Sequence, residues 1–289
     1  MSPALYCIPA ATLMKLSHWI TRSAAAHPDT DVALIETRHL VAFVTGLSLT
    51  QQRIHDPDLT ADEEAALDAL AARLHAGEPL AYLLGQQPFY GLELKVSRAT
   101  LIPRSDSEAV AERALHLLRG MHRPAVLDLG TGSGALALAI ASARPDAIVR
   151  GSDQSLDALA VAAANAHRLG IANVRFLHGD WLAPFADASA DLIISNPPYI
   201  APDDPHLAAL HHEPSSALVA ADDGYRDLFA IMDGAPRVLK TGGWLIMEHG
   251  RQQGETLRNR AARHPVWQHI ATGQDYARRD RYTEMQKRG

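Results

Sequence analysis

Residues 125–141 read AVLDLGTGSGALALAIA, and this stretch decides the fold. Its first five residues are almost wholly apolar and predict a short buried strand, whereas its last seven predict an alanine-rich helix. Glycines stand at positions 130, 132 and 134, between the two elements. Glycine lets the backbone turn sharply and lets a ligand lie against it without a Cβ in the way. This order is typical of one unit of an α/β sheet.

Further strands alternate with helices along the rest of the chain. Short apolar segments predict strands at 148–152, 174–177, 192–195 and 244–247, and alanine-rich helical segments lie between the first three strands of the series. Such alternation is typical of a doubly wound, Rossmann-like sheet. We therefore expect an α/β domain over residues 104–289.

Residues 1–87 predict a small all-helical domain. Apolar residues recur at helical spacing, and predict one helix from Leu13, Leu16 and Ile20 and a second, amphipathic one from Val32, Ile35, Leu40 and Phe43. Thr60 and Glu63 have the spacing of a capping box at the start of a further helix. Leu67, Leu70 and Leu74 follow on one face of it. Residues 88–103 alternate polar and apolar side chains after Gly91, which predicts a β-hairpin linker between the domains.

Charge and cysteine content narrow the possible partners and compartment. The net charge is −6, and residues 1–90 hold five Lys and Arg against ten Asp and Glu. An acidic region is a poor partner for phosphate backbones, so direct nucleic-acid binding is not expected. Cys7 is the single cysteine, which excludes an intrachain disulfide, and the chain has no signal-type segment and no apolar run of the roughly 18 residues that a membrane span needs. A cytoplasmic protein without a membrane partner is expected.

The glycine loop predicts a nucleotide-like ligand but leaves its identity open. Gly130, Gly132 and Ala135 satisfy the G-x-G-x-x-A form of a dinucleotide fingerprint. Asp153, at the end of the next predicted strand, is placed to bind ribose hydroxyls in either a nicotinamide or an S-adenosylmethionine site. These residues alone do not choose between the two cofactors.

Two later positions favour S-adenosylmethionine. Asp180 and Trp181 follow the third strand, where a carboxylate can accept from an adenine amino group while the indole covers its face. The stretch SNPPYI at 195–200 then follows the fourth strand. Every one of these features lies at the carboxyl end of a strand, where open α/β sheets bind ligands.

The residues from Asn196 to Tyr199 predict a holder for a planar NH2 group. Such a nitrogen is a poor nucleophile because its lone pair is delocalised. The Asn196 side-chain oxygen and the Pro197 carbonyl can accept its two N–H bonds and favour the geometry for attack on a methyl group. Pro197 and Pro198 keep these acceptors rigid, and Tyr199 can stack on the planar group. Asn196 cannot act as a general base, so catalysis here rests on positioning and electrostatics.

In these motifs and in several other segments the chain resembles the release-factor glutamine methyltransferases, the PrmC/HemK family. The matching segments are 77–82 (GEPLAY), 102–108 (IPRSDSE), 128–134 (DLGTGSG), 196–199 (NPPY), 213–214 (EP), 217–222 (ALVAAD) and 248–250 (EHG). The resemblance implies a Rossmann-like methyltransferase domain that uses S-adenosylmethionine and releases S-adenosylhomocysteine. It implies that the substrate is the glutamine of the Gly-Gly-Gln motif in class 1 peptide-chain release factors, methylated at N5.

The resemblance also implies roles for particular residues. Residues that would contact the cofactor are Gly130, Thr131, Gly132, Ser133, Gly134, Asp153, Asp180, Trp181 and Asn196. Residues that would hold the glutamine are Asn196, Pro197, Pro198 and Tyr199. Ser105 departs from the family pattern and resembles the sister family that methylates a large-subunit ribosomal protein, and the ending from Arg281 also departs.

Other readings remain open at this stage. The same NH2-holding motif serves N6-adenine and N4-cytosine nucleic-acid methyltransferases, and a silent S-adenosylmethionine-binding adaptor is a rival from another class. Arg104, Asp106 and Glu108 fit a substrate mouth or a domain junction equally well. The cluster of His206, His211 and His212 with Asp203 and Asp204 matches no compact metal motif, so no metal is expected and a solvated loop is favoured. His249 is expected to be structural.

Overall fold

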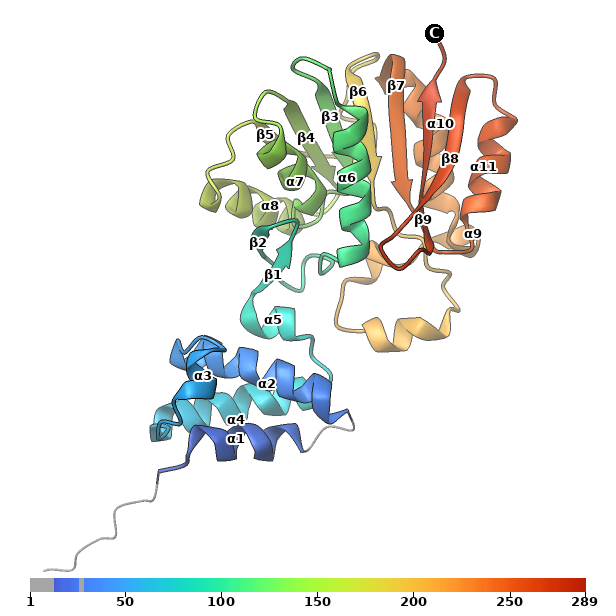
Figure 1. The fold of residues 1–289 in the computed structure, drawn as a ribbon. Helices are drawn as coiled ribbons and strands as arrows, with labels where there is room; N and C mark the ends of the chain where they lie inside the picture. Colours follow the sequence, from blue (N-terminus) through green and yellow to red (C-terminus); the bar gives the residue numbers. More distant parts are fainter. Residues whose placement is uncertain (1–12, 26–28) are drawn as a thin grey trace, which may run out of the picture. The chain divides into compact units, whose positions relative to one another are not determined.

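A computed structural model describes residues 13–25 and 29–289. The chain divides into two compact units, Met1–Leu84 and Gly85–Gly289 (Figure 1). Cys7 lies outside the described residues. The functional division expected at residues 87 and 103 stays a prediction. In the described part of the chain, no helix is both long enough and apolar enough to cross a membrane.

The first unit is all helical. Its helices are α1 (Leu16–Ala24), α2 (Thr30–Thr45), α3 (Gln51–Ile54), α4 (Ala61–His75) and α5 (Leu80–Leu84). Trp19 is fully buried in its core, and the indole Nε1 donates to Asp68 Oδ1 at 2.7 Å. The predicted capping box is confirmed: Thr60 and Glu63 satisfy each other's backbone N–H groups at the start of α4. The unit has an apolar core of its own, which includes Leu16, Trp19, Leu40 and Leu67.

The helix α2 is confirmed, but its buried face differs from the predicted one. Leu40 is buried, whereas Val32 is 46% exposed, Ile35 62% and Phe43 54%. The buried face consists of Ala33, Thr37, Leu40 and Val41. Apolar residues occur almost all round this helix, so spacing alone could not select the face that packs. Leu13, predicted in the first helix, precedes α1 and is 51% exposed.

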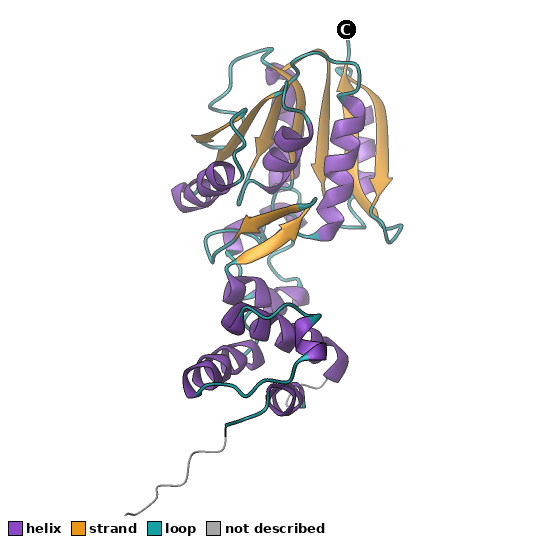
Figure 2. Cartoon of the chain, turned by 60° about the vertical axis from the view of Figure 1, so that its left-hand side comes forward, coloured by secondary structure: helices purple, strands orange, loops and turns teal. Residues whose placement is uncertain are grey.

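The second unit begins with a hairpin separate from the main sheet (Figure 2). Strands β1 (Gln86–Phe89) and β2 (Leu92–Lys95) pair antiparallel. Tyr90 and Gly91 form the turn with φ of 49° and 74°. Two positive φ values match the twist of a two-residue hairpin.

Seven strands form the main sheet in the order β5-β4-β3-β6-β7-β9-β8. They are β3 (Ala125–Leu129), β4 (Ile148–Asp153), β5 (Val174–His178), β6 (Ala190–Ser195), β7 (Leu239–Glu248), β8 (Trp267–Gln274) and β9 (Asp280–Lys287). The strands β3 to β7 pair in parallel, and β9, which pairs antiparallel with both β7 and β8, is the one strand of the seven that runs in the opposite direction. The chain winds from β3 outward to β5 and then returns to the other side of β3 as β6. The crevice of the doubly wound sheet therefore lies between the carboxyl ends of β3 and β6.

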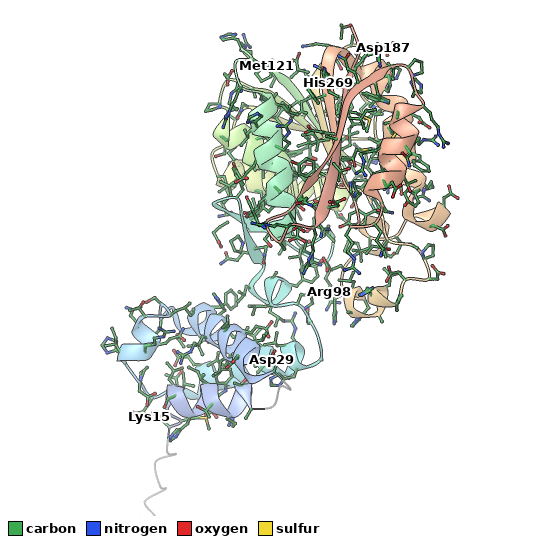
Figure 3. All side chains as sticks on the ribbon, turned by 45° about the vertical axis from the view of Figure 1, so that its right-hand side comes forward. Lys15, Asp29, Arg98, Met121, Asp187 and His269 are labelled. Carbon is green, nitrogen blue, oxygen red and sulfur yellow. The ribbon has the colours of Figure 1, made fainter. Side chains whose placement is uncertain are left out.

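Helices cover both faces of this sheet (Figure 1). They are α6 (Glu108–Leu117), α7 (Ala135–Ala143), α8 (Leu156–Arg168), α9 (Ala221–Gly224), α10 (Arg226–Val238) and α11 (Gly254–Ala262), with short 3₁₀ turns η1 (Ser105–Ser107), η2 (Pro205–Leu210) and η3 (Ser215–Ala217). Val126 packs with α6 and α7, while its neighbour Leu127 packs with α10 and α11 on the opposite face. Alternate residues of one strand thus enter two cores. Met121 and Asp187, which precede β3 and β6, both lie at the end of the unit opposite the crevice (Figure 3).

Candidate active site

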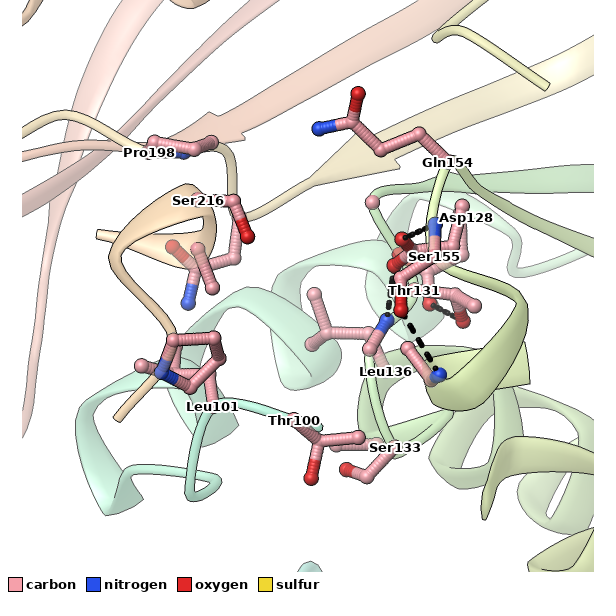
Figure 4. A pocket seen from close by; sticks show the side chains of 18 of the residues that line it. Thr100, Leu101, Asp128, Thr131, Ser133, Leu136, Gln154, Ser155, Pro198 and Ser216 are labelled. Carbon is pink, nitrogen blue, oxygen red and sulfur yellow. Dashed lines mark hydrogen bonds between the residues drawn. The ribbon is translucent and has the colours of Figure 1, made fainter. Parts of the chain in front are cut away.

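A cavity with about 960 Å³ of empty space, its open mouth included, lies at the carboxyl ends of the central strands. Nine of the residues predicted from the sequence line it: Gly130, Thr131, Gly132, Ser133, Asp153, Asp180, Trp181, Asn196 and Pro198. Gly134, Pro197 and Tyr199 do not. Gly134 is the N-cap of α7, and Tyr199 lines a second cavity beside the first. Figure 4 shows Pro198 and Ser216 on one side of the cavity and Thr131, Gln154 and Ser155 on the other.

A buried carboxyl group, that of Asp128, supports the glycine loop. Asp128 was not among the site residues predicted from the sequence. Asp128 Oδ2 accepts from Thr131 Oγ1 at 2.7 Å and from the Ala137 backbone N–H at 3.1 Å (Figure 4). Burial raises the pKa of Asp128 to about 7. An acidic residue inside the apolar strand AVLDL was the signal that could have identified it.

Gly130 is required where it stands. Its φ is +68°, and a Cβ added there would lie 3.0 Å from the Trp181 ring. Trp181 itself has a φ of +39°, and its carbonyl accepts from Ser152 Oγ at 3.1 Å. The indole and the glycine loop therefore form adjoining walls, with no side chain between them.

Asp153 is the last residue of β4 and braces the loop as well as lining the cavity. Oδ2 accepts from the Gly132 backbone N–H and Oδ1 from that of Ser155, both at 2.9 Å. A carboxylate offers about four lone-pair sites, so these two bonds leave capacity for ligand hydroxyl groups. Asp180, one strand further, is exposed at the rim.

A buried asparagine ties the hairpin to the glycine loop. Asn165 is fully buried in α8, and its Nδ2 donates to the carbonyls of Ser133 and Lys95, each at 3.0 Å. Its Oδ1 accepts from the Lys95 backbone N–H at 2.7 Å. The sequence analysis missed this residue; its signal was one amide in the alanine-rich run VAAANAH.

Asn196 follows β6 directly, and rigid neighbours hold it. Pro197 and Pro198 are buried, and β6 ends at Ser195, before the first proline. The Tyr199 carbonyl accepts from Gln253 Nε2 at 3.1 Å. A Cβ on Gly224, whose φ is +84°, would lie 2.2 Å from that carbonyl oxygen, so only glycine fits there. The loop is therefore fixed along its whole length.

Behind Asn196 lies a second buried carboxyl group, that of Glu248 at the end of β7. Ser107 Oγ donates to Glu248 Oε2 at 2.5 Å, and Asn196 Nδ2 donates to Ser107 Oγ at 3.3 Å. Tyr199 Oη donates to Glu248 Oε1 at 3.3 Å. Burial raises the pKa of Glu248 to about 7, and burial together with Glu248 raises that of Tyr199. Neither Ser107 nor Glu248 was selected as a site residue from the sequence.

The second cavity is lined by Tyr199 and Glu248 together with charged residues, most of which follow the hairpin. Its lining includes Arg104, Asp106, Glu108 and Arg281. Each of the three residues left open by the sequence lines this cavity and also has a partner: Arg104 pairs with Glu213, Asp106 with Arg281 at 3.0 Å, and Glu108 Oε1 accepts from the Tyr90 backbone N–H at 2.8 Å. Arg281, in the divergent ending, thus belongs to β9 and to this mouth.

The histidines lie apart from these cavities. His206 is exposed and pairs with Asp204 at 2.7 Å within the loop that carries η2. Within residues 13–25 and 29–289, no three His, Cys, Asp or Glu side chains are grouped so as to hold a metal ion. His249 is fully buried, its Nε2 lies 2.9 Å from Thr283 Oγ1, and burial lowers its pKa.

The arrangement can hold two ligands side by side. The glycine loop, Asp153 and Trp181 suit a nucleoside whose ribose and base lie against backbone, carboxylate and indole. Asn196 lines the same cavity, and Tyr199, at the other end of the same loop, lines the second cavity. A group held at Asn196 therefore lies between a nucleoside site and a separate entrance.

Comparisons with known proteins agree with this geometry. The family described as methyltransferase domain matches residues 123–288, and the one described as PrmC N-terminal domain matches residues 15–85. A release factor glutamine methyltransferase of Vibrio cholerae is 43% identical over 94% of this chain and 94% of its own. That of Bordetella pertussis is 48% identical over 80% of this chain and 86% of its own.

A solved structure shares the fold. The crystal structure of a methyltransferase from Pyrococcus furiosus has a TM-score of 0.51 at 16% identity, over 75% of this chain and 97% of that one. The predicted Rossmann-like methyltransferase fold with an N-terminal helical domain is confirmed. With both domains matched and identity above 40% across nearly its whole length, the chain belongs to the release factor glutamine methyltransferase family.

Proposed function

We propose that this protein transfers a methyl group from S-adenosylmethionine to the N5 nitrogen of the glutamine in the Gly-Gly-Gln motif of class 1 release factors. Family membership supports the reaction and the cofactor. The observation that carries the proposal is that Asn196 and the glycine loop flank one crevice of the sheet and line one cavity. A planar NH2 group held by Asn196 would then face the ligand of the glycine loop.

The chain's residues fit the cofactor. Trp181 packs directly against Gly130, where a Cβ would lie only 3.0 Å from the ring, so the loop backbone and the indole form adjoining walls against which a ligand can lie. The Asp153 carboxylate has acceptor capacity left for ribose hydroxyls. When bound, the cofactor supplies an electrophilic methyl group. Its proposed contacts are the predicted residues that line the cavity: Gly130, Thr131, Gly132, Ser133, Asp153, Asp180, Trp181 and Asn196.

Asn196 and Pro197 are proposed to hold the glutamine amide. Asn196 Nδ2 donates to Ser107, so the side-chain oxygen is left for an incoming N–H, and no described residue donates to it. The Pro197 carbonyl would accept the second N–H. With both protons engaged, the nitrogen lone pair can turn toward the methyl group, and preorganised acceptors stabilise the positive charge that develops on nitrogen. The products are S-adenosylhomocysteine and the methylated amide, whose nitrogen loses one proton to solvent water.

Tyr199 and the second cavity are proposed to receive the rest of the substrate loop. Tyr199 is anchored through Glu248 and faces that cavity, where its ring can stack on the glutamine amide plane. The glycines that precede the glutamine would let the loop enter a narrow mouth, because they carry no side chains. Arg104, Asp106 and Glu108 at this mouth are already paired and give it a fixed shape.

Residues 1–87 are proposed to recognise the release factor as a protein, with 88–103 as linker and 104–289 as the catalytic domain. A glutamine amide is the same in every protein, so the cavity cannot choose a partner. The first ninety residues hold ten acidic side chains against five basic ones, which suits a basic docking face and contacts that weaken as salt rises. A cytoplasmic location, where release factors act, is part of this proposal.

The test is tritium transfer from S-adenosylmethionine to purified candidates. Label in an intact release factor, far above that in a Gly-Gly-Gln peptide, is the expected result. Label in a large-subunit ribosomal protein or in nucleic acid, with the release factor blank, would leave the NH2-holding chemistry and overturn the substrate. A chain that begins at residue 88 should lose the preference for the intact factor over the peptide. Unchanged S-adenosylhomocysteine affinity would show that this shortened chain is folded.

A further inference from the structure

Three side chains from distant parts of the sequence meet where the active-site cavity adjoins the second cavity: Ser107 and Asn196 line the first and Glu248 lines the second. Ser107 comes from η1 at the start of α6, Asn196 from the loop after β6, and Glu248 from the end of β7. Ser107 and Glu248 are 4% and 1% exposed. Two hydrogen bonds join them in series: Ser107 Oγ to Glu248 Oε2 at 2.5 Å and Asn196 Nδ2 to Ser107 Oγ at 3.3 Å.

With Glu248 ionised, the chemistry of these groups allows only one direction for the series. An ionised carboxylate accepts hydrogen bonds and cannot donate them, so the single Ser107 hydroxyl proton points at Glu248. Ser107 Oγ then has only lone pairs for Asn196 and requires the NH2 end of that amide. The amide oxygen consequently lies at the opposite end. If the Asn196 amide were turned over, two acceptor oxygens would face each other in a buried site, at the cost of an unsatisfied polar group.

The same carboxylate also reaches the second residue proposed to hold the substrate. Tyr199 Oη donates to Glu248 Oε1 at 3.3 Å. The two oxygens of one buried group therefore anchor one side chain each, on either side of the rigid Pro197–Pro198 pair. Both anchors come from outside the loop that they orient.

We propose that Ser107 and Glu248 are positioning residues that fix the Asn196 amide with its oxygen toward the substrate NH2 group. This inference rests on the proposed function, because it assigns Asn196 the amide-holding role. Neither residue touches the reacting atoms. Ser107 affects the reaction through Asn196, and Glu248 affects it through both Asn196 and Tyr199.

A double-mutant cycle between Ser107 and Asn196 tests this directly. With release factor and cofactor saturating, Ser107→Ala should lower the single-turnover rate by about 10- to 100-fold, since a misplaced reactant loses orientation. In an Asn196→Ala background, the same change should cost less than about threefold, because there is no amide left to orient. Ser107→Thr retains the hydroxyl and should restore most of the rate. S-adenosylhomocysteine affinity should stay unchanged in Ser107→Ala.

Ser195→Ala is the matched control. Ser195 is adjacent to Asn196, fully buried, and its Oγ donates to the Leu129 carbonyl at 2.8 Å, outside the series. Its loss removes a buried hydroxyl of the same kind and should leave the rate within about threefold of the parent. If Ser107→Ala behaves like this control, or if its cost is the same with and without Asn196, the proposal is wrong.

A second measurement needs no substrate, so it separates this inference from the proposed function. The sequence holds four Asn residues, and selective ¹⁵N labelling gives one side-chain NH2 signal for each. The Asn196 signal is assigned by its loss in Asn196→Ala. Its protons should exchange with solvent about tenfold faster in Ser107→Ala and in Glu248→Gln than in the parent, because hydrogen-bonded amides exchange slowly. An unchanged signal in both variants would overturn the inference even if release factor is methylated, and a parent that leaves release factor unlabelled would overturn only the substrate.

Discussion

On the glycine-loop side of the cavity, most polar groups come from one short stretch of chain; on the Asn196 side they come from segments far apart. Asp128, Thr131 and Gly132 are neighbours in sequence, and Asp153 lies at the end of the next strand. Asn196, by contrast, depends on Ser107, 89 residues before it, and on Glu248. The first side is formed mainly by β3, its glycine loop and the next strand, whereas the second needs segments from across the domain.

This difference assigns separate tasks to the two sides. The glycine-loop side presents backbone, two carboxylates and an indole, groups that bind a nucleoside equally well before and after methyl transfer. The Asn196 side presents directional acceptors, whose value depends on the charge that develops on the attacking nitrogen. Substitutions on the first side should therefore change cofactor affinity, and those on the second should change the rate.

The largest effect is expected on the Asn196 side. Asn196→Ala removes the proposed acceptor of a substrate N–H and should raise the barrier to methyl transfer by about 2 to 4 kcal/mol. Single-turnover kinetics measures this, and S-adenosylhomocysteine affinity should change far less. A variant that transfers methyl within a few-fold of the parent rate would remove Asn196 from the mechanism.

The next effect lies on the opposite side. Asp153→Ala should weaken S-adenosylmethionine and S-adenosylhomocysteine alike, by about 1.5 to 3 kcal/mol, because both share the ribose that this carboxylate would bind. Calorimetry with each ligand measures the loss. Unequal losses would mean that Asp153 senses the methyl group, and unchanged affinity for both would refute the ribose contact.

The pH dependence of the rate should follow the ionisation of Glu248. If Ser107 must donate to an ionised carboxylate, the rate should fall by about tenfold per pH unit below a pKa of about 7, and Glu248→Gln should remove that dependence. Arg281, Asp106, Tyr199 and Ser107 face Glu248 and are present in both proteins. The buried Asp128 also has a pKa raised to about 7, so S-adenosylhomocysteine affinity is measured over the same range to separate the two carboxyls.

The contribution of Glu248 and Asp128 to stability should change with pH in the opposite direction to the rate. For both carboxyls the folded-state pKa is above the ordinary value of 4.5 for Glu or 3.8 for Asp. The folded protein therefore retains protons that the unfolded chain has released, and the contribution of these groups to stability is lost as pH rises from about 4 to about 7. Denaturant titrations at several pH values check this. His249, whose pKa is lowered by burial, contributes in the opposite direction, so the parent is compared with Glu248→Gln; the same slope of stability against pH in both proteins would contradict the assignment to Glu248.

The smallest effect is expected from two substitutions in the glycine loop, which distinguish backbone strain from contact with a side chain. Gly130→Ala and Gly132→Ala both place a Cβ at positive φ, +68° and +55°, but only the first would meet the Trp181 ring, at 3.0 Å. Each should lower stability by about 1 kcal/mol through backbone strain. Only Gly130→Ala should also change Trp181 fluorescence and weaken cofactor binding. Equal behaviour of the two variants would argue against the indole as a cavity wall.

The same contrast explains what the sequence could predict. Five strands and the glycine loop follow from local patterns, because period and turn residues act over a few positions. The carboxyl-end rule then places Asp153, Trp181 and Asn196 on one edge of the sheet without knowledge of strand order. Ser107 and Glu248 could not be found in this way, since nothing local to either residue indicates that they meet. Strands β8 and β9 were not predicted because their sequences lack a clear apolar alternation, and β9 is recognisable only by its pairing with β7.

The N-terminal unit shows a further limit of pattern reading. Apolar residues occur on more than one face of α2, so periodicity does not show which face is buried. Packing against α1 and α4 buries the face that carries Leu40 and Val41. The exposed Val32, Ile35 and Phe43 fall on the face that spacing first indicated. The position of α2 along the chain could be predicted from the sequence, whereas its rotation about its own axis could not.

The central claim is that the Asn196 side holds a planar side-chain amide for attack by its nitrogen. Peptide mass mapping of a release factor after a single turnover tests it most directly. The account predicts one added methyl group, on the side-chain nitrogen of the glutamine in the Gly-Gly-Gln motif, and its loss when Asn196→Ala replaces the parent enzyme. A methyl group on a lysine, an arginine or a carboxylate, transferred at the parent rate without Asn196, would contradict it.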